Sequence, residues 1–245
     1  MPVHALQDKV AAFARRLEPK RVIGFDKIRL GRDFDGGYVL LDDFSDVEMA
    51  LSLGIADDAS WDLAIAQRGI PVHQFDPTID RSPIDHPLMT FHKQGIAASD
   101  VPGAVSLDTL ASELLSGCQK ALLKIDVEGH EWPLFAAASP ATLSKFAQIT
   151  CEFHGFNRLA DAAWYDSASV AIAKMKSIFD VVHVHGNNAM PFANVANVIL
   201  PILLEITFAN RNHYQMAETN EIFPTALDQP NLPQIPDMYL GCFKF

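Results

Sequence analysis

Cysteine is scarce in this sequence. The three cysteines, Cys118, Cys151 and Cys242, lie far apart and form no C-x-x-C pair. Neither a disulfide framework nor a zinc knuckle is indicated by such spacing, and a reducing cytoplasm is the compartment that we expect.

Basic residues and long apolar runs are also in short supply. Lysine and arginine number 19 against 30 acids, a formal net charge of −11, so a phosphate backbone would be repelled and nucleic acid is not an expected partner. The N-terminus lacks the apolar core of a signal peptide. The longest apolar candidate, which begins at Val195, contains Pro201 and Glu205 and is better interpreted as a core strand. No segment reaches the roughly 20 apolar residues that span a bilayer, so no membrane partner is expected.

What remains is the composition of an ordinary globular protein, with 49% hydrophobic and 20% charged residues in 245 positions. We expect one domain over residues 1–245. Its ends are predicted to be an amphipathic helix over residues 3–17 and an extended, proline-bearing tail over residues 213–245.

Between these ends, strand-like and helix-like patterns alternate. This alternation predicts an α/β fold with a doubly wound, mostly parallel sheet of seven strands. The last two strands have no helix between them, which predicts an antiparallel hairpin at the edge of the sheet. The expected strands cover residues 49–55, 71–78, 89–98, 121–129, 148–156, 180–188 and 197–210. The main expected helices cover residues 57–69, 107–117 and 167–179.

The end of the first strand, SLGIADDASWD, indicates a cofactor without phosphate. It contains one glycine, Gly54, where a dinucleotide fingerprint would have three. S-adenosylmethionine (SAM) brings a carboxylate, an ammonium, a sulfonium and a ribose, and suits one glycine followed by acids better than a pyrophosphate does. About twenty residues later, HQFDPT offers Asp76 at the end of the second strand, where a carboxylate can accept hydrogen bonds from both ribose hydroxyls. A simple Asp-Pro turn is the alternative interpretation.

The segment LLKIDVEGHEW ends the fourth strand on charges, and ITCEFH ends the fifth in the same way. Asp126, Glu152 and His154 could converge there as ligands of a divalent cation such as Mg²⁺, which would lower the pKa of an acceptor hydroxyl. In the alternative without metal, His154 or His130 acts directly as general base.

Structural roles compete with these functional ones. Glu128 and Glu131 are expected to open a helix after Gly129, where carboxylates favour the positive end of the helix dipole. Glu152 and His154 share one face of their strand and could simply bond to each other. His183 and His185 alternate in the same way on the sixth strand, and either pack there or line an acceptor pocket.

Seven segments together resemble the FkbM-type SAM-dependent methyltransferases, in the methyltransferase-like branch. They are RLGRDFDGGYVL, SLGIADDASWD, HQFDPT, LLKIDVEGHEW, ITCEFH, HVHGNN and LDQPNLP, and they cover roughly residues 29–233. KIDVEG followed by Glu131 is the most specific of them, and His130 departs from the small residue expected at its position.

The resemblance implies a Rossmann-like methyltransferase fold, SAM as methyl donor and O-methylation of a small molecule or sugar. It also implies that the turn Asp35-Gly36-Gly37 covers the methionine end of SAM. Asp58, four residues after Gly54, and Ala97, in the third expected strand, are assigned to the same cofactor site, together with Asp126.

Three other classes of function stay open on sequence alone. The first is an NAD-dependent oxidoreductase on the same architecture, which the missing glycines after Gly54 disfavour. The second is a non-catalytic SAM-binding module in which the charges after Ile125 are structural. The third is a metal-dependent hydrolase that uses Asp126, Glu152 and His154.

Overall fold

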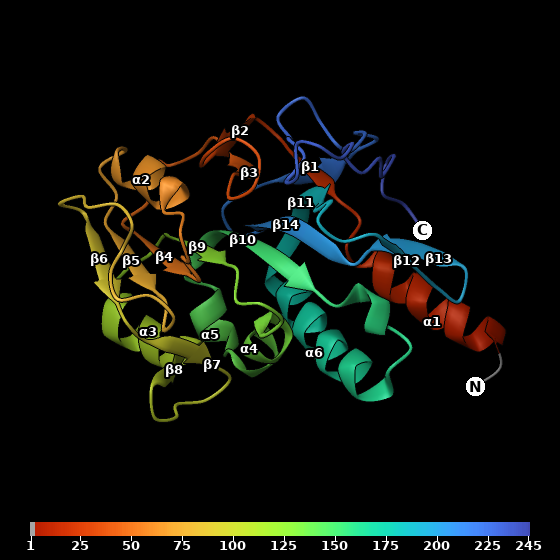
Figure 1. Cartoon of the computed structure of the whole chain (residues 1–245), viewed down its shortest axis with the longest axis horizontal. Coiled ribbons are helices and arrows are strands. Elements are labelled where there is room, and N and C mark those ends of the chain that lie inside the picture. Colours follow the sequence, from red (N-terminus) through yellow and green to blue (C-terminus); the bar gives the residue numbers. More distant parts are fainter. Residues whose placement is uncertain (1–2) are drawn as a thin grey trace.

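A seven-stranded mixed sheet runs through the centre of the computed structural model, which describes residues 3–245 (Figure 1). The strand order is β11-β14-β10-β9-β4-β5-β6. The bounds are β4 Met49–Leu53, β5 Val72–Phe75, β6 Met89–His92, β9 Ala121–Ile125, β10 Phe146–His154, β11 Phe179–Gly186 and β14 Leu203–Asn210.

The direction of each strand follows from the connection that precedes it. β4 is parallel to β5 and β9, β10 is parallel to β9, and β6 is parallel to β5. β14 alone is antiparallel to both of its neighbours, β10 and β11. The chain reaches β14 from β11 through a small hairpin, β12 Phe192–Val195 and β13 Val198–Pro201, rather than through a crossover helix. The predicted α/β fold and its antiparallel edge pair are therefore confirmed.

Helices cover both faces of this sheet. One face carries α1 Val3–Arg15, α3 Leu107–Leu114, α4 Glu131–Ala137, α5 Pro140–Leu143 and α6 Ala162–Ile178, and encloses the larger hydrophobic core. The other face carries α2 Ser60–Ala66 and the hairpin of β2 Lys27–Leu30 and β3 Tyr38–Leu41. Alternation along the strands divides the side chains, so that Leu51 and Leu53 enter the first core and Ala50 the second.

Two expected strands are each divided in the structure. The third ends at His92, and residues 95–97 form a separate strand, β7 Gly95–Ala97, which pairs with β8 Ala104–Ser106 outside the main sheet. The seventh is interrupted at Ile202, between Pro201 of β13 and the start of β14. The last long helix begins five residues earlier than expected, because Asp161 caps α6 by accepting hydrogen bonds from the backbone N–H groups of Ala163 and Trp164.

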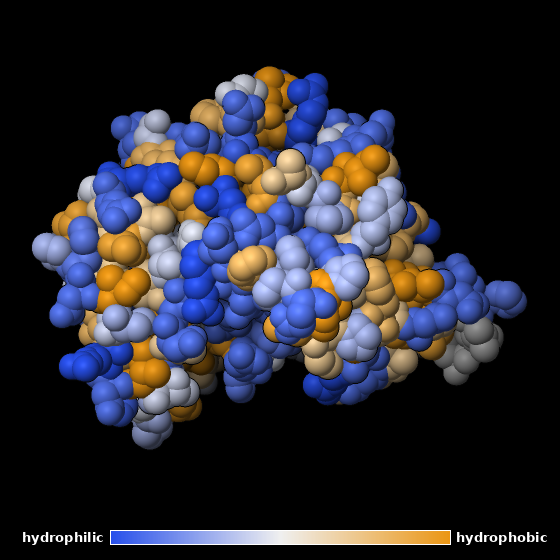
Figure 2. All heavy atoms as spheres, turned by 45° about the horizontal axis from the view of Figure 1, so that its top comes forward, coloured by the Kyte–Doolittle hydropathy of each residue, from blue (hydrophilic) through white to orange (hydrophobic). Residues whose placement is uncertain are grey.

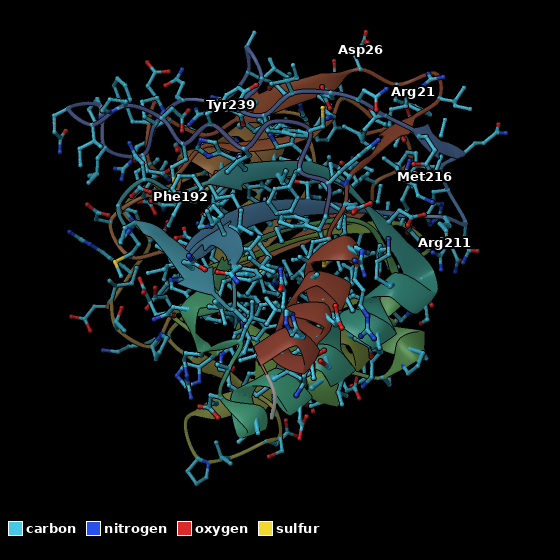
Figure 3. The ribbon with its side chains drawn as sticks, turned by 90° about the vertical axis from the view of Figure 1, so that its right-hand side faces the viewer. Arg21, Asp26, Phe192, Arg211, Met216 and Tyr239 are labelled. Atoms are coloured by element: carbon cyan, nitrogen blue, oxygen red, sulfur yellow. The ribbon has the colours of Figure 1, made fainter. Side chains whose placement is uncertain are left out.

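The C-terminal segment crosses the molecule. β15 Met216–Glu218 pairs with β1 Lys20–Val22, and Figure 3 shows Arg21 and Met216 together at this edge. The chain then passes over the top of the view in Figure 1, beside β2 and β3, and ends next to α1, where the Arg15 side chain donates to the Phe245 carbonyl. On the face that carries this segment, hydrophilic residues form a band down the middle (Figure 2).

None of the helices found in residues 3–245 has both the length and the apolar character that a membrane crossing requires. Cys118, Cys151 and Cys242 are all unpaired thiols.

Candidate functional site

A cavity of about 670 Å³ opens at the carboxyl ends of β4, β5 and β9. Gly54, Asp76 and Asp126, which follow these three neighbouring strands, all line it. The position is the usual one for a ligand in an open α/β sheet. Carboxylates dominate the lining, which holds Asp35, Asp57, Asp58, Asp76, Asp126 and Glu128 beside the cations Arg32 and Lys124.

Gly54 brings the first and fourth expected strands together. Its φ is 83°, and a Cβ atom built on it would lie 1.7 Å from the carbonyl oxygen of Asp126, so only glycine fits. The Asp126 N–H donates to the Leu53 carbonyl at 2.8 Å, and the Lys124 ammonium donates to the Gly54 carbonyl at 2.8 Å. Lys124 thus holds the turn after β4 and does not bond directly to Asp126 or Glu152.

Asp76 fastens the same turn from the other side. One of its oxygens accepts from the N–H groups of Ile55 and Ala56, both at 2.9 Å, and the other from the N–H and the hydroxyl of Thr78. Burial raises the pKa of Asp76, but these hydrogen bonds lower it by more than burial raises it. The net pKa lies below the ordinary value, and the side chain is ionised. A ribose hydroxyl would have to share these oxygens with the backbone, so the binding of ribose hydroxyls by Asp76 stays a prediction.

The turn of residues 31–37 forms another wall. Asp35, Gly36 and Asp58 line the cavity. Gly36 has a φ of 89°, and a Cβ atom there would lie 2.2 Å from the Asp58 carboxylate. Gly37 lies outside the lining and against Arg29, whose guanidinium a Cβ atom would meet at 2.0 Å.

Ala97 lies outside the lining as well. The residues before it, Gly95 and Ile96, contribute instead. The strand division after His92 moves this segment onto β7.

Tyr38 is a site residue that sequence reasoning missed. It is buried, lines the cavity and donates its hydroxyl to the Asp126 carboxylate at 3.3 Å. Burial raises the pKa of Tyr38, and the charge of Asp126 raises it further, so the phenol stays protonated. The available signal was its position directly after the Gly36-Gly37 turn.

Glu152 is buried beside the cavity and does not line it. Its carboxylate accepts from the Asn187 amide at 3.0 Å and lies 4.0 Å from His154 Nε2. Burial raises the pKa of Glu152 well above its ordinary value, and the neighbouring charges of Asp126 and Glu205 add to that rise. A protonated Glu152 is the form that this environment favours.

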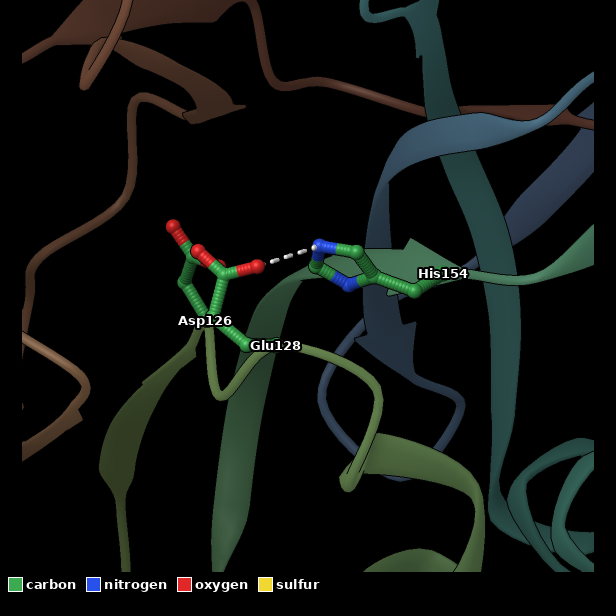
Figure 4. A group of neighbouring side chains, drawn as sticks. All are labelled: Asp126, Glu128 and His154. Atoms are coloured by element: carbon green, nitrogen blue, oxygen red, sulfur yellow. Dashed lines mark ion pairs between the residues drawn. The ribbon is translucent and has the colours of Figure 1, made fainter. Parts of the chain in front are cut away.

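His154 lies between three carboxylates at the end of β10. Its Nδ1 atom is 3.2 Å from the Glu131 carboxylate, and its Nε2 atom is 3.4 Å from the Glu128 carboxylate (Figure 4). Burial lowers the pKa of His154, but the adjacent Glu131 carboxylate, with the charges of Asp126 and Glu128, raises it more, and the net pKa is above the ordinary value.

Glu128 takes the place that Glu152 was predicted to have beside Asp126 and His154. Asp126, Glu128 and His154 each offer one ligand atom, and these atoms lie within 4.8 Å of one another (Figure 4). Glu128 and Gly129 have φ values of 52° and 96°, so the chain makes a loop before α4 begins at Glu131. This loop turns the Glu128 side chain toward His154, and only Glu131 lies in the first turn of the helix.

The two histidines of β11 bind the tail. His183 Nε2 lies 2.7 Å from Asp228, and His185 lies 3.0 Å from both Glu205 and Asp237. Neither histidine lines the cavity. His130, the other candidate base, does line it, and among residues 3–245 its side chain makes no hydrogen bond.

Comparisons with known proteins add little to this geometry. No protein-family model matches the sequence, and no curated protein matches it. Among solved structures, “Putative hemolysin from Streptococcus thermophilus” aligns at a TM-score of 0.37 and 10% identity, over 81% of this chain and 74% of that one. EvdMO1 aligns at a TM-score of 0.32 and 12% identity, over 83% of this chain and 47%, about half, of that one. These scores are too low to support any statement on function.

Proposed function

We propose that this protein is a SAM-dependent methyltransferase that methylates a hydroxyl group of a small molecule or sugar. The observation that carries the proposal is the meeting of Gly54, Asp76 and Asp126 in one cavity at the ends of three neighbouring strands. Its volume of about 670 Å³ is in the range of small-molecule sites.

The charges of the cavity favour a cationic cofactor. Six carboxylates face it with two cationic side chains, Arg32 and Lys124, so a sulfonium and an ammonium group would be attracted and a pyrophosphate repelled.

The backbone of the turn supports the same choice. The N–H groups of Ile55 and Ala56, which a dinucleotide would need for its phosphates, already donate to Asp76. This disfavours the NAD-dependent alternative on structural grounds, in addition to the missing glycines.

SAM, when bound, supplies an electrophilic methyl group that an acceptor oxygen takes by in-line displacement. The acceptor has to lose its proton, and we assign His154, beside the cavity, as the base. Its Nδ1 atom lies 3.2 Å from the Glu131 carboxylate, so in the neutral ring Nδ1 would keep the proton and Nε2 would accept one. Tyr38 and Asp126 both line the cavity and bond to each other, and they could orient the acceptor hydroxyl by hydrogen bonds.

A divalent cation is the alternative means of activating the acceptor. Two carboxylates and an imidazole suit such an ion, and the spacing of Asp126, Glu128 and His154 fits one. The ion would lower the pKa of the hydroxyl and orient it. Glu152, placed in this set on sequence grounds, is held by Asn187 and is the less favoured ligand.

The same carboxylates restrict the charge of the acceptor. The carboxylates of the lining, Asp126 and Glu128 among them, would repel a phosphate or carboxylate group, so we propose a neutral, hydroxylated acceptor.

Incubation with SAM labelled in the methyl group, together with a panel of sugars and polyhydroxylated small molecules, tests the proposal. We expect one acceptor to gain a labelled methyl group. The bond should be stable in base, which identifies it as an ether and not an ester, and Asp126→Ala should abolish the transfer. If SAM binds and no acceptor is methylated, a non-catalytic SAM-binding module becomes the better assignment.

A further inference from the structure

The segment LDQPNLP in the tail has no role in the mechanism above, yet it contacts the wall of the cavity. Gln229 accepts a hydrogen bond from the Phe34 N–H at 2.8 Å and donates to the Asp33 carboxylate at 3.2 Å. Both partners belong to the turn of residues 31–37, and Phe34 has a positive φ of 63°, a conformation that needs support from outside the turn.

Asn231 makes the second contact. It is only 4% exposed, and its amide nitrogen donates to Asp35 at 3.1 Å and to Glu205 of β14 at 2.6 Å. Both partners are carboxylates that can only accept, which fixes the orientation of the amide group. Asn231 therefore ties Asp35, a residue of the cavity wall, to the central sheet.

Two histidines hold the segment in its place. Lys27 can only donate, so His183 accepts from it through Nδ1 and donates through Nε2 to Asp228, next to Gln229. Asp228 also accepts from the N–H and hydroxyl of Thr225. His185 bonds to Glu205, the partner of Asn231, and to Asp237 further along the tail. The contacts with the turn thus extend from an anchored segment and not from a loose end.

We propose that Gln229 and Asn231 are positioning residues of the cofactor site: by holding the turn of residues 31–37 over the cavity, they set the affinity for SAM. Neither side chain lines the cavity, so they act through Asp35 and Gly36, which do. A turn that is already held in place loses less conformational freedom when the cofactor binds. This inference rests on the proposed function, because the ligand in question is SAM.

Titration calorimetry with SAM on the full chain is the first measurement. Gln229→Ala and Asn231→Ala should each raise the dissociation constant by roughly two- to tenfold, the effect of losing one or two hydrogen bonds. Asn220→Ala is the matched control, because Asn220 lies in the same tail and its side chain bonds only to the exposed Lys244. Its SAM affinity should equal that of the wild type.

A double-mutant cycle separates positioning from a general loss of structure. If Asn231 acts through Asp35, the effects of Asn231→Ala and Asp35→Ala on SAM affinity should be less than additive. Unchanged affinity in both Gln229→Ala and Asn231→Ala, in a wild type that binds SAM, would overturn the inference and leave the proposed function standing.

Hydrogen exchange gives a readout that needs no cofactor. The Phe34 amide should exchange faster in Gln229→Ala than in the wild type, because its acceptor is removed. If the wild type binds no SAM, the proposed function fails, and this exchange rate alone decides whether the tail holds the turn: unchanged exchange rejects that contact.

Discussion

The Nδ1 atom of His154 lies 3.2 Å from the carboxylate of Glu131, which is fully buried. The same Glu131 oxygen accepts from the N–H groups of Gly129 at 2.9 Å and Val127 at 3.3 Å. Glu131 therefore joins the loop after β9 to the end of β10. With Nδ1 of His154 facing Glu131, the Nε2 atom faces the Glu128 carboxylate.

This pair predicts a pH profile. If His154 is the base, it works in its neutral form, so kcat should rise with pH through the raised pKa of His154. Glu131→Gln removes the charge that raises this pKa, and the rising limb should move to lower pH. His154→Gln should lower kcat by about 10²–10⁴-fold, the usual contribution of a general base.

Steady-state kinetics over a range of pH values measure this directly. A Glu131→Gln variant with a lower kcat but an unmoved limb would mean that Glu131 supports the loop and does not tune His154.

Asp76 predicts a loss of cofactor affinity. Asp76→Ala leaves the N–H groups of Ile55 and Ala56 without their acceptor and frees the turn after β4. SAM binding should weaken by about 1–3 kcal/mol, or roughly five- to 150-fold. Asp80→Ala is the matched control, because Asp80 is an exposed acid on the same loop, paired only with Lys93. Equal affinities in the two variants would remove Asp76 from the cofactor site.

The cation alternative predicts a dependence on metal. If Asp126, Glu128 and His154 hold an ion, a chelator should abolish turnover and added Mg²⁺ or Mn²⁺ should restore it. Glu128→Ala should raise the metal concentration needed for half-maximal activity, whereas Glu113→Ala, an exposed acid on α3, should not. Full activity in the presence of the chelator would leave the direct-base mechanism.

His185 predicts a loss of stability at alkaline pH. Both ring nitrogens face carboxylates, so both must donate and the ring is protonated. Burial lowers the pKa of His185, but Glu205 and Asp237 outweigh burial and raise it from 6.5 to about 10. Because the folded pKa lies above the unfolded one, the stabilisation is complete below pH 6.5 and declines as the pH rises through about 10.

Urea unfolding of the wild type and His185→Gln across that range checks this. The difference between the two free energies of unfolding should shrink as the pH rises. His183→Gln is the control, since burial lowers the pKa of His183 and its neutral form already prevails. A wild-type-to-His185→Gln difference that is constant with pH would contradict a protonated His185.

The core of the candidate site could be predicted from the sequence because it depends on local features. Gly54, Asp76 and Asp126 each follow an apolar run directly, and the carboxyl ends of neighbouring parallel strands meet at one edge of a sheet. Ala97 lies outside the cavity lining because Met89–His92 and Gly95–Ala97 form two separate strands and the chain leaves the main sheet between them, which the apolar pattern of residues 89–98 does not show.

The remaining parts depend on contacts that no local pattern shows. Glu128 faces His154 only because two successive residues adopt positive φ. Tyr38 reaches Asp126 from a hairpin 88 positions earlier, and Gln229 reaches Phe34 across 195 positions. Such pairings are decided by how the elements pack, and the local pattern of a single sequence does not reveal them.

Titration calorimetry of the wild-type protein with SAM, with NAD in a parallel experiment, tests the central claim most directly. We predict saturable binding of SAM with one molecule per chain and no binding of NAD, because the amides after β4 are occupied by Asp76 and the cavity is lined by carboxylates. Binding of NAD but not of SAM would contradict the account.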